Sequence, residues 1–183
     1  MLIAQAKQEE NIVEYILYMF QLHDMLRGLN FEENAIREKL ASPMATSKDQ
    51  EEQIMTWYND LIGQMDKEGL RVKGIVSDVL SKVQELTLLH GMLLQQLNDD
   101  KYKKLYEEVN PFIEEYRMKS KDEGVSDILI CLNALYAKLL LKLKKVGISD
   151  SSEEAFTSFS NLLSHIALRY KEMYQGRLNF SAN

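Results

Sequence analysis

The sequence of 183 residues has few of the residues that mark disulfide-rich or β-rich proteins, with one cysteine, two prolines and eight glycines. Cys131 lies inside an apolar run and cannot form a disulfide within the chain; such a cysteine is typically a buried, unreactive thiol. Strict alternation of apolar and polar residues is also missing. Both β-strands and an internal disulfide framework therefore have little support.

Long uninterrupted apolar runs and concentrated positive charge are missing as well. Lys138 and Lys142 interrupt the most apolar segment well short of the roughly 20 residues that a bilayer requires. The 22 basic and 28 acidic residues give a net charge of −6, and the basic residues near position 103 are followed at once by Glu107 and Glu108. An acidic surface without a basic patch repels phosphate backbones. We expect neither a membrane span nor a nucleic-acid partner.

Signals for secretion and for common enzyme classes are also absent. The first residues, MLIAQAKQEENI, lack the basic segment and the long apolar segment of a secretory signal, which predicts a cytoplasmic location. Dinucleotide and phosphate loops, the serine hydrolase elbow, His-Glu-x-x-His and Cys-x-x-Cys do not occur. These absences favour a protein that is not an enzyme and that holds no cofactor and no metal.

Helical periodicity is present throughout and is strongest between residues 125 and 146, VSDILICLNALYAKLLLKLKKV. At 100° per residue, one broad apolar face contains Ile128, Leu129, Leu132, Leu135, Tyr136, Leu139, Leu140, Leu143 and Val146. A second apolar ridge contains Ile130, Ala134, Ala137 and Leu141. A helix that is apolar nearly all round is either surrounded by other helices or lies in a subunit interface.

Apolar residues also recur every three or four positions in the rest of the chain, which predicts helices over about 5–27, 30–40, 47–69, 75–97, 102–116 and 151–176. Capping boxes are expected at Asn30 and Ser151, a cap at Ser47, and a kink or one-turn break at Pro111. The predicted fold is all-α: one domain over 1–183, built as a single bundle of six or seven antiparallel helices around the helix at 125–146, with a frayed tail over 176–183.

Four segments of the sequence resemble a bacterial family of uncharacterised proteins known only as a domain of unknown function. They are ENIVEYILYMFQLHDMLRG (residues 10–28), WYNDLIGQM (57–65), PFIEEYRMKS (111–120) and ALYAKLLLKLKKVGIS (134–149). The resemblance extends over nearly the whole chain. It implies a helical fold and a bacterial origin, and it implies no active residue.

Two histidines, His23 and His90, are predicted near the centres of the apolar stripes of their helices, whereas His165 falls off its stripe. A buried neutral imidazole needs a partner for its donor and for its acceptor, so two hydrogen-bonded core histidines are the common explanation. The alternative is a metal or acid–base site where the helices cross. Zinc usually has three or four protein ligands, and neither histidine follows a glutamate at the spacing of di-iron bundles.

Aromatic residues could line a ligand cleft between helices, although most of them fall on buried stripes where core packing is the usual explanation. The candidates for a ligand site are therefore His23, His90, Tyr15, Trp57 and Tyr58.

Two functions from different classes remain open. The first is a non-enzymatic interaction or scaffold protein, expected to form a homodimer or to bind a protein partner through an exposed apolar ridge that includes Ile130, Ala137, Leu141 or a neighbouring patch. The second is a small-molecule-binding or catalytic bundle that uses a cleft near His23 and His90. The absence of catalytic motifs favours the first.

Overall fold

The computed structural model describes residues 3–97, 99–120 and 124–178, and within these ranges every regular element is helical. Eight α-helices occur in the order α1 (Ile3–Glu10), α2 (Ile12–Gly28), α3 (Glu33–Ile36), α4 (Lys48–Lys67), α5 (Ser77–Gln95), α6 (Asp100–Ser120), α7 (Asp127–Leu143) and α8 (Asp150–Tyr174). A π-helical turn, η1 (Arg37–Ala41), and a 3-10 turn, η2 (Ser42–Met44), connect α3 to α4. The prediction of an all-α protein is confirmed.

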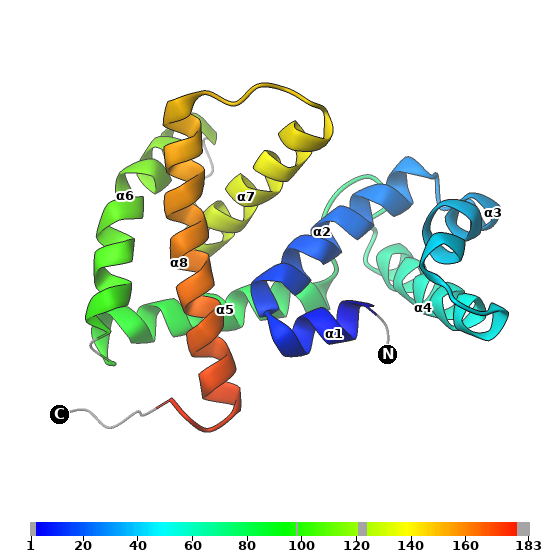
Figure 1. Cartoon of the computed structure of the whole chain (residues 1–183), viewed down its shortest axis with the longest axis horizontal. Coiled ribbons are helices and arrows are strands. Elements are labelled where there is room, and N and C mark those ends of the chain that lie inside the picture. Colours follow the sequence, from blue (N-terminus) through cyan, green and yellow to red (C-terminus); the bar gives the residue numbers. More distant parts are fainter. Residues whose placement is uncertain (1–2, 98, 121–123, 179–183) are drawn as a thin grey trace.

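Helix α8 is the longest element and packs against α2, α5, α6 and α7 (Figure 1). In this view α6 lies on one side of α8, α2 and α7 lie on the other, and α5 runs across them. Helices α3 and α4 form one end of the molecule, where α4 packs against η1. The crossing of α5 distinguishes this arrangement from a simple bundle of antiparallel helices.

Helix α7 is central only in its first half. Ile128, Cys131 and Leu132 have no exposed surface, and Leu135 and Tyr136 still pack against the core. The following leucines are half-buried, and the Leu143 side chain is 61% exposed. The expected burial of the whole apolar face is therefore wrong for the C-terminal half of the helix.

The second ridge of α7 also differs from the expectation of an exposed apolar surface. Ile130 has no exposed surface and Ala134 has only 3%, because this part of the ridge packs into the core. Only Ala137 is exposed and Leu141 half-exposed. Any docking surface on α7 must therefore lie nearer its C-terminal end.

One helix predicted over residues 5–27 is two, α1 and α2, because Asn11 interrupts it. Asn11 has extended backbone, and its side-chain oxygen accepts hydrogen bonds from the backbone N–H groups of Val13 and Glu14. This is an N-cap, which starts a new helix. The apolar stripe continues across the break, so periodicity alone does not reveal it.

Of the three predicted N-caps, two fail and one holds. Ser47 caps α4 as expected, with its side chain accepting from the Gln50 N–H. Asn30 does not cap, because its φ of 52° places it in a left-handed turn. The cap of α8 is Ser149 rather than Ser151. Of the two alternatives expected at Pro111, a kink or a one-turn break, the break does not occur, because α6 continues through this residue.

The predicted frayed tail, residues 176–183, lies beyond α8. Gly176 turns the chain with a φ of 64°, and Leu178 packs back against the core. Leu178 thus contacts the folded part of the chain, and the rest of the predicted tail, residues 179–183, lies outside the described residues.

Candidate functional site

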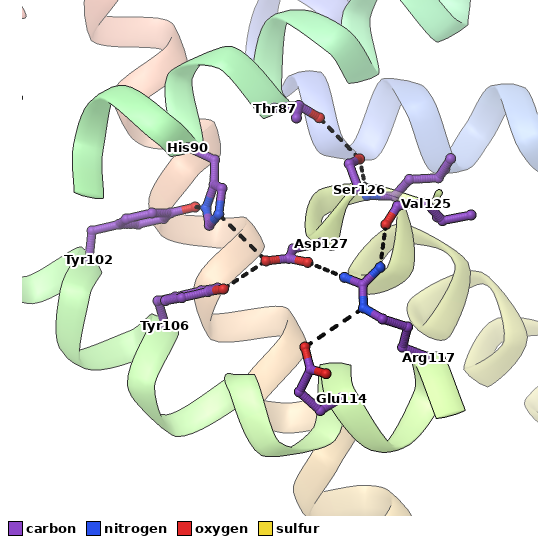
Figure 2. Close-up of polar contacts among 10 residues, drawn as sticks. Thr87, His90, Tyr102, Tyr106, Glu114, Arg117, Val125, Ser126 and Asp127 are labelled. Carbon is purple, nitrogen blue, oxygen red and sulfur yellow. Dashed lines mark hydrogen bonds and ion pairs between the residues drawn. The ribbon is translucent and has the colours of Figure 1, made fainter. Parts of the chain in front are cut away.

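A polar cluster centred on Asp127 joins α5, α6 and α7 (Figure 2). Asp127 is the first residue of α7, where the helix dipole favours a carboxylate, and Ser126 caps the helix through the N–H of Leu129. One carboxylate oxygen accepts a hydrogen bond from Arg117 at 2.5 Å, and the other accepts one from the Tyr106 hydroxyl at 2.7 Å. The carboxylate therefore ties α6 to the start of α7.

Arg117 also binds the segment that leads into α7. Its guanidinium donates to the Val125 carbonyl at 2.8 Å and lies 3.7 Å from the Glu114 carboxylate of its own helix. On the other side of the segment, the Thr87 hydroxyl of α5 donates to the Ser126 hydroxyl at 3.2 Å. The entry to α7 is thus held from α5 and from α6 at once.

The arrangement of His90 between a tyrosine and Asp127 has the form of a proton relay. His90 Nδ1 is 2.7 Å from the Tyr102 hydroxyl, and His90 Nε2 is 3.8 Å from the Asp127 carboxylate. If the Tyr102 hydroxyl donates to Nδ1, the proton of the neutral His90 ring is on Nε2 and points at Asp127. The histidine of a catalytic triad is oriented by its aspartate in the same way. The order tyrosine, histidine, aspartate is the order that activates a nucleophile.

Burial keeps the tyrosine of this relay out of reach of a substrate. Tyr102 has no exposed surface, and burial raises the pKa of its hydroxyl far above the ordinary value of 10.0. Burial and then the Asp127 hydrogen bond likewise raise the pKa of Tyr106, and burial lowers the pKa of His90. A substrate cannot reach a group without exposed surface, so the Tyr102 hydroxyl serves to connect α6 to α5 through His90.

A second polar cluster, around Asp99, joins the start of α6 to α8. The carboxylate accepts hydrogen bonds from His165 Nε2 at 3.0 Å, Arg169 Nε at 2.6 Å and the Tyr102 N–H at 3.0 Å. Burial alone would raise the pKa of Asp99, but the hydrogen bonds from His165, the Tyr102 N–H and Arg169 outweigh it and lower the pKa to about 2. The carboxylate is thus held ionised.

His165 is 7% exposed, so the prediction that it lies off the buried stripe of its helix is wrong. Its ring stacks on Tyr102 with 5.9 Å between centroids, and the other neighbour of Tyr102 is His90, at 5.7 Å. Tyr102 therefore lies between two histidines and links the Asp127 cluster to the Asp99 cluster.

His23 lies in a different part of the core. It has no exposed surface, its Nδ1 donates to the Met19 carbonyl at 2.5 Å, and its Nε2 accepts from the Val76 N–H at 3.5 Å. Burial lowers the pKa of His23. Both ring nitrogens are thus used within the core, and the partners of His23 are different from those of His90.

The aromatic candidates are also divided between sites. Trp57 and Tyr58 on α4 line a small hollow with Tyr18 and Met44, and the Trp57 and Tyr58 rings are 5.4 Å apart. Tyr15 on α2 is half-buried, and burial and then Asp78 raise its pKa. The structure joins Trp57 with Tyr58, and places Tyr15, His23 and His90 elsewhere.

Larger surface hollows lie away from these residues. One of about 700 Å³ separates α1 from the C-terminal end of α8, and one of about 390 Å³ lies between α6, α7 and α8. Neither histidine lines these two hollows. Within the described ranges, the histidines, cysteine and carboxylates form no group of three or more that could hold a metal ion.

Residues 1–177 match the model of a family described as a domain of unknown function, DUF4924. The chain belongs to this family. Comparison with curated proteins and with solved structures gives no match. The family match confirms the resemblance that was inferred from four helical segments of the sequence. The matched range includes every residue of the Asp127 and Asp99 clusters.

In this DUF4924 chain the residues that sequence reasoning missed are Tyr106, Arg117 and Asp127. The i, i+4 spacing of Tyr102 and Tyr106 placed both on one face of α6, but an apolar stripe does not reveal which hydroxyls bind a carboxylate. Ser126 followed by Asp127 is a helix-start signal that could have placed the carboxylate. The partners of that carboxylate, Arg117 and Tyr106, lie 10 and 21 residues away in the chain, and no local sequence pattern predicts contacts over these separations.

None of the described helices is long and apolar enough to cross a bilayer.

Proposed function

We propose that this DUF4924 protein is a non-enzymatic helical scaffold of the cytoplasm that forms a homodimer through the C-terminal half of α7. The observation that carries the proposal is the incomplete burial of the most apolar helix of the chain. Leu143 is 61% exposed and Val146, just beyond the helix, is 50% exposed, and the leucines at 139–141 are half-buried. Contiguous exposed apolar surface of this kind is typical of an interaction site.

The geometry of the helix places these residues on one side. Leu139 and Leu143 continue the face that Ile128 and Leu132 bury in the first half of α7, and Val146 follows the end of the helix after a turn at Lys145. In Figure 1 the two helices α7 and α8 diverge toward the loop that joins them, so this end of α7 lies apart from α8. A partner that covers it would extend the core of the protein.

Charge around this surface favours a second copy of the chain as the partner. Exposed lysines at 142, 144 and 145 border the apolar residues, and exposed Asp150 and Glu154 lie at the start of α8 nearby in the chain. A two-fold axis between antiparallel copies would bring the lysines of one copy to the acidic residues of the other. An apolar centre with a polar, charged rim is the usual composition of an interface.

Size-exclusion chromatography with light scattering tests the proposal. The chain of 21.2 kDa should elute with twice that mass at micromolar concentration. The double substitution Leu143→Glu with Val146→Glu should give the monomer mass, because it would bury carboxylates in the apolar centre. Circular dichroism should show unchanged helix content, since both side chains are exposed.

Leu168→Glu is the matched control. Leu168 on α8 is 50% exposed, like Val146, and lies outside the proposed interface. This variant should remain a dimer. A wild-type protein that is monomeric at all concentrations, or equal dissociation of the control and the double variant, would refute the proposed interface.

A further inference from the structure

The connection between α4 and α5, residues 69–76 (the strap), is held in place by side chains of α2. In the described part of the chain, residues 71–75 make no hydrogen bond between backbone groups. Arg27 of α2 supplies polar contacts instead, because its guanidinium donates to the Leu70 carbonyl at 3.0 Å and also to the Gly74 carbonyl. The residues between these two carbonyls are exposed. Few polar contacts therefore fix this part of the strap.

His23 of α2 holds the end of the strap, where α5 begins. The backbone N–H of Val76, the residue before α5, donates to His23 Nε2 at 3.5 Å, and His23 Nδ1 lies 2.5 Å from the Met19 carbonyl. A carbonyl only accepts hydrogen bonds, so the ring proton is on Nδ1 and Nε2 is the acceptor. His23 has no exposed surface and Val76 has 1%. Bulk water therefore does not reach this bond while the strap is closed.

Protonation of His23 would turn this contact from attraction into repulsion. The imidazolium carries a proton on each nitrogen, so Nε2 would become a donor that faces the N–H donor of Val76. Two buried donors without an acceptor cost free energy, and the positive charge of the buried ring adds a desolvation cost. At 3.5 Å the hydrogen bond that opposes opening is a weak one. Both costs disappear when the end of the strap lifts and water reaches Nε2.

The charged groups around His23 do not compensate for its burial. Asp24 and Arg27 of α2 and Glu68, just after α4, act on the ring, but burial has the largest effect and lowers the pKa of His23. Asp24 is exposed and pairs with Arg27 at 3.1 Å. Glu68 is also exposed and accepts from the N–H and the hydroxyl of Ser77, both at 2.8 Å. Both carboxylates therefore have partners at the surface.

We propose that the strap is an acid-sensitive device, in which protonation of His23 detaches Val76 and opens the strap while α5 and α8 stay folded. The strap joins α4, at one end of the molecule, to α5 (Figure 1). Its opening would therefore loosen the attachment of the α3–α4 end to the rest of the protein. This response goes beyond the proposed scaffold function and does not depend on the dimer surface of α7.

Hydrogen exchange of the full chain, followed by NMR, tests the proposal with the Val76 amide as the reporter. In the open state an imidazole with the ordinary pKa of 6.5 is protonated in about tenfold excess at about pH 5.5. After correction for the intrinsic pH dependence of exchange, the protection of Val76 should therefore fall about tenfold between about pH 7.5 and about pH 5.5. Carboxylates with ordinary pKa values of about 4 stay ionised in this range.

The amides of the core separate opening of the strap from unfolding of the whole chain. Leu86 of α5 and Leu162 of α8 have no exposed surface. Because α5 and α8 stay folded when the strap opens, both amides should remain at least about tenfold better protected than Val76 at both pH values.

Two variants assign the response to one histidine. The side-chain oxygen of glutamine in His23→Gln can accept a hydrogen bond from Val76 but cannot be protonated, so the protection of Val76 should change less than about twofold over the same range. His90→Gln is the matched control, because it removes another buried histidine whose pKa is lowered by burial. This variant should keep the tenfold fall.

A fall of less than about twofold at Val76 in the wild-type protein would overturn the proposal. Equal protection of Val76, Leu86 and Leu162 would overturn it as well, because the strap would then open only when the whole chain unfolds. A tenfold fall that persists in His23→Gln, or that disappears in His90→Gln, would assign the response to another group and refute the role of His23. If His23→Gln does not fold, the wild-type comparison and His90→Gln decide the test.

Discussion

Asparagine in place of Asp99 should lower the free energy of unfolding at neutral pH, and the loss should disappear in acid. The side chain of Asp99 is 7% exposed and accepts hydrogen bonds from His165, Arg169 and the Tyr102 N–H. Asparagine has nearly the same shape but no charge, so it imitates a protonated Asp99. The comparison therefore isolates the contribution of the carboxylate charge.

The magnitude follows from the lowered pKa of Asp99. The hydrogen bonds of the folded state outweigh the effect of burial and lower this pKa from 3.8 to about 2. At 1.36 kcal/mol for each pH unit, the difference is worth about 2 kcal/mol of stability. Because the folded-state pKa is below the unfolded-state value, this stability is fully present above pH 3.8 and is lost as the pH falls through about 2.

Urea denaturation of the wild-type protein and Asp99→Asn at a series of pH values measures this difference. The variant should be less stable by about 2 kcal/mol at pH 7, and the two proteins should converge as the pH approaches 2. Asp60→Asn is the control, because Asp60 is exposed on α4, and it should change the stability by no more than about 0.5 kcal/mol. A difference for Asp99→Asn that does not vary with pH would refute the reasoning.

The remaining predictions concern two histidines, one arginine and one proline. Burial lowers the pKa of His23 and His90, so NMR titration should place both midpoints below 6.5. Because the unfolded chain then binds protons at a higher pH than the folded protein does, both histidines should lower the free energy of unfolding as the pH falls below 6.5. Arg117→Met should lower the free energy of unfolding by about 2 kcal/mol in urea, because the bonds to Val125 and Asp127 are lost. Pro111→Ala should raise it by up to about 3 kcal/mol, because α6 continues through a residue that cannot donate its backbone bond.

Elements whose signals are local were predicted well from the sequence. Helix α4 begins after Ser47 as expected, and Gly69, the last residue of the predicted range 47–69, has the φ of 71° that is typical of a glycine ending a helix. The failures have physical causes of two kinds. Asn11 splits a helix while the apolar stripe continues, and α7 has an apolar face that its neighbours cover only in the first half.

Long-range polar contacts were the least predictable part. A position on the apolar stripe correctly indicated that His23 and His90 are buried, but not which groups bind them. His165 was missed because its partner, Asp99, is 66 residues away in the chain. Burial of a histidine depends on whether a donor or acceptor from another helix reaches it, and a single helical wheel contains no information about other helices.

The distribution of polar partners connects the fold to the proposals. In the described ranges no buried side-chain nitrogen or oxygen lacks a hydrogen-bond partner, so the buried polar groups stabilise the contacts between helices. Tyr102 and Asp127, which have the order of a catalytic relay with His90, are inaccessible or already bonded. The apolar end of α7, by contrast, is exposed at Leu143 and Val146. Removal of apolar surface of this kind from water supplies binding energy, which is the physical basis of the proposed association between two copies of the chain.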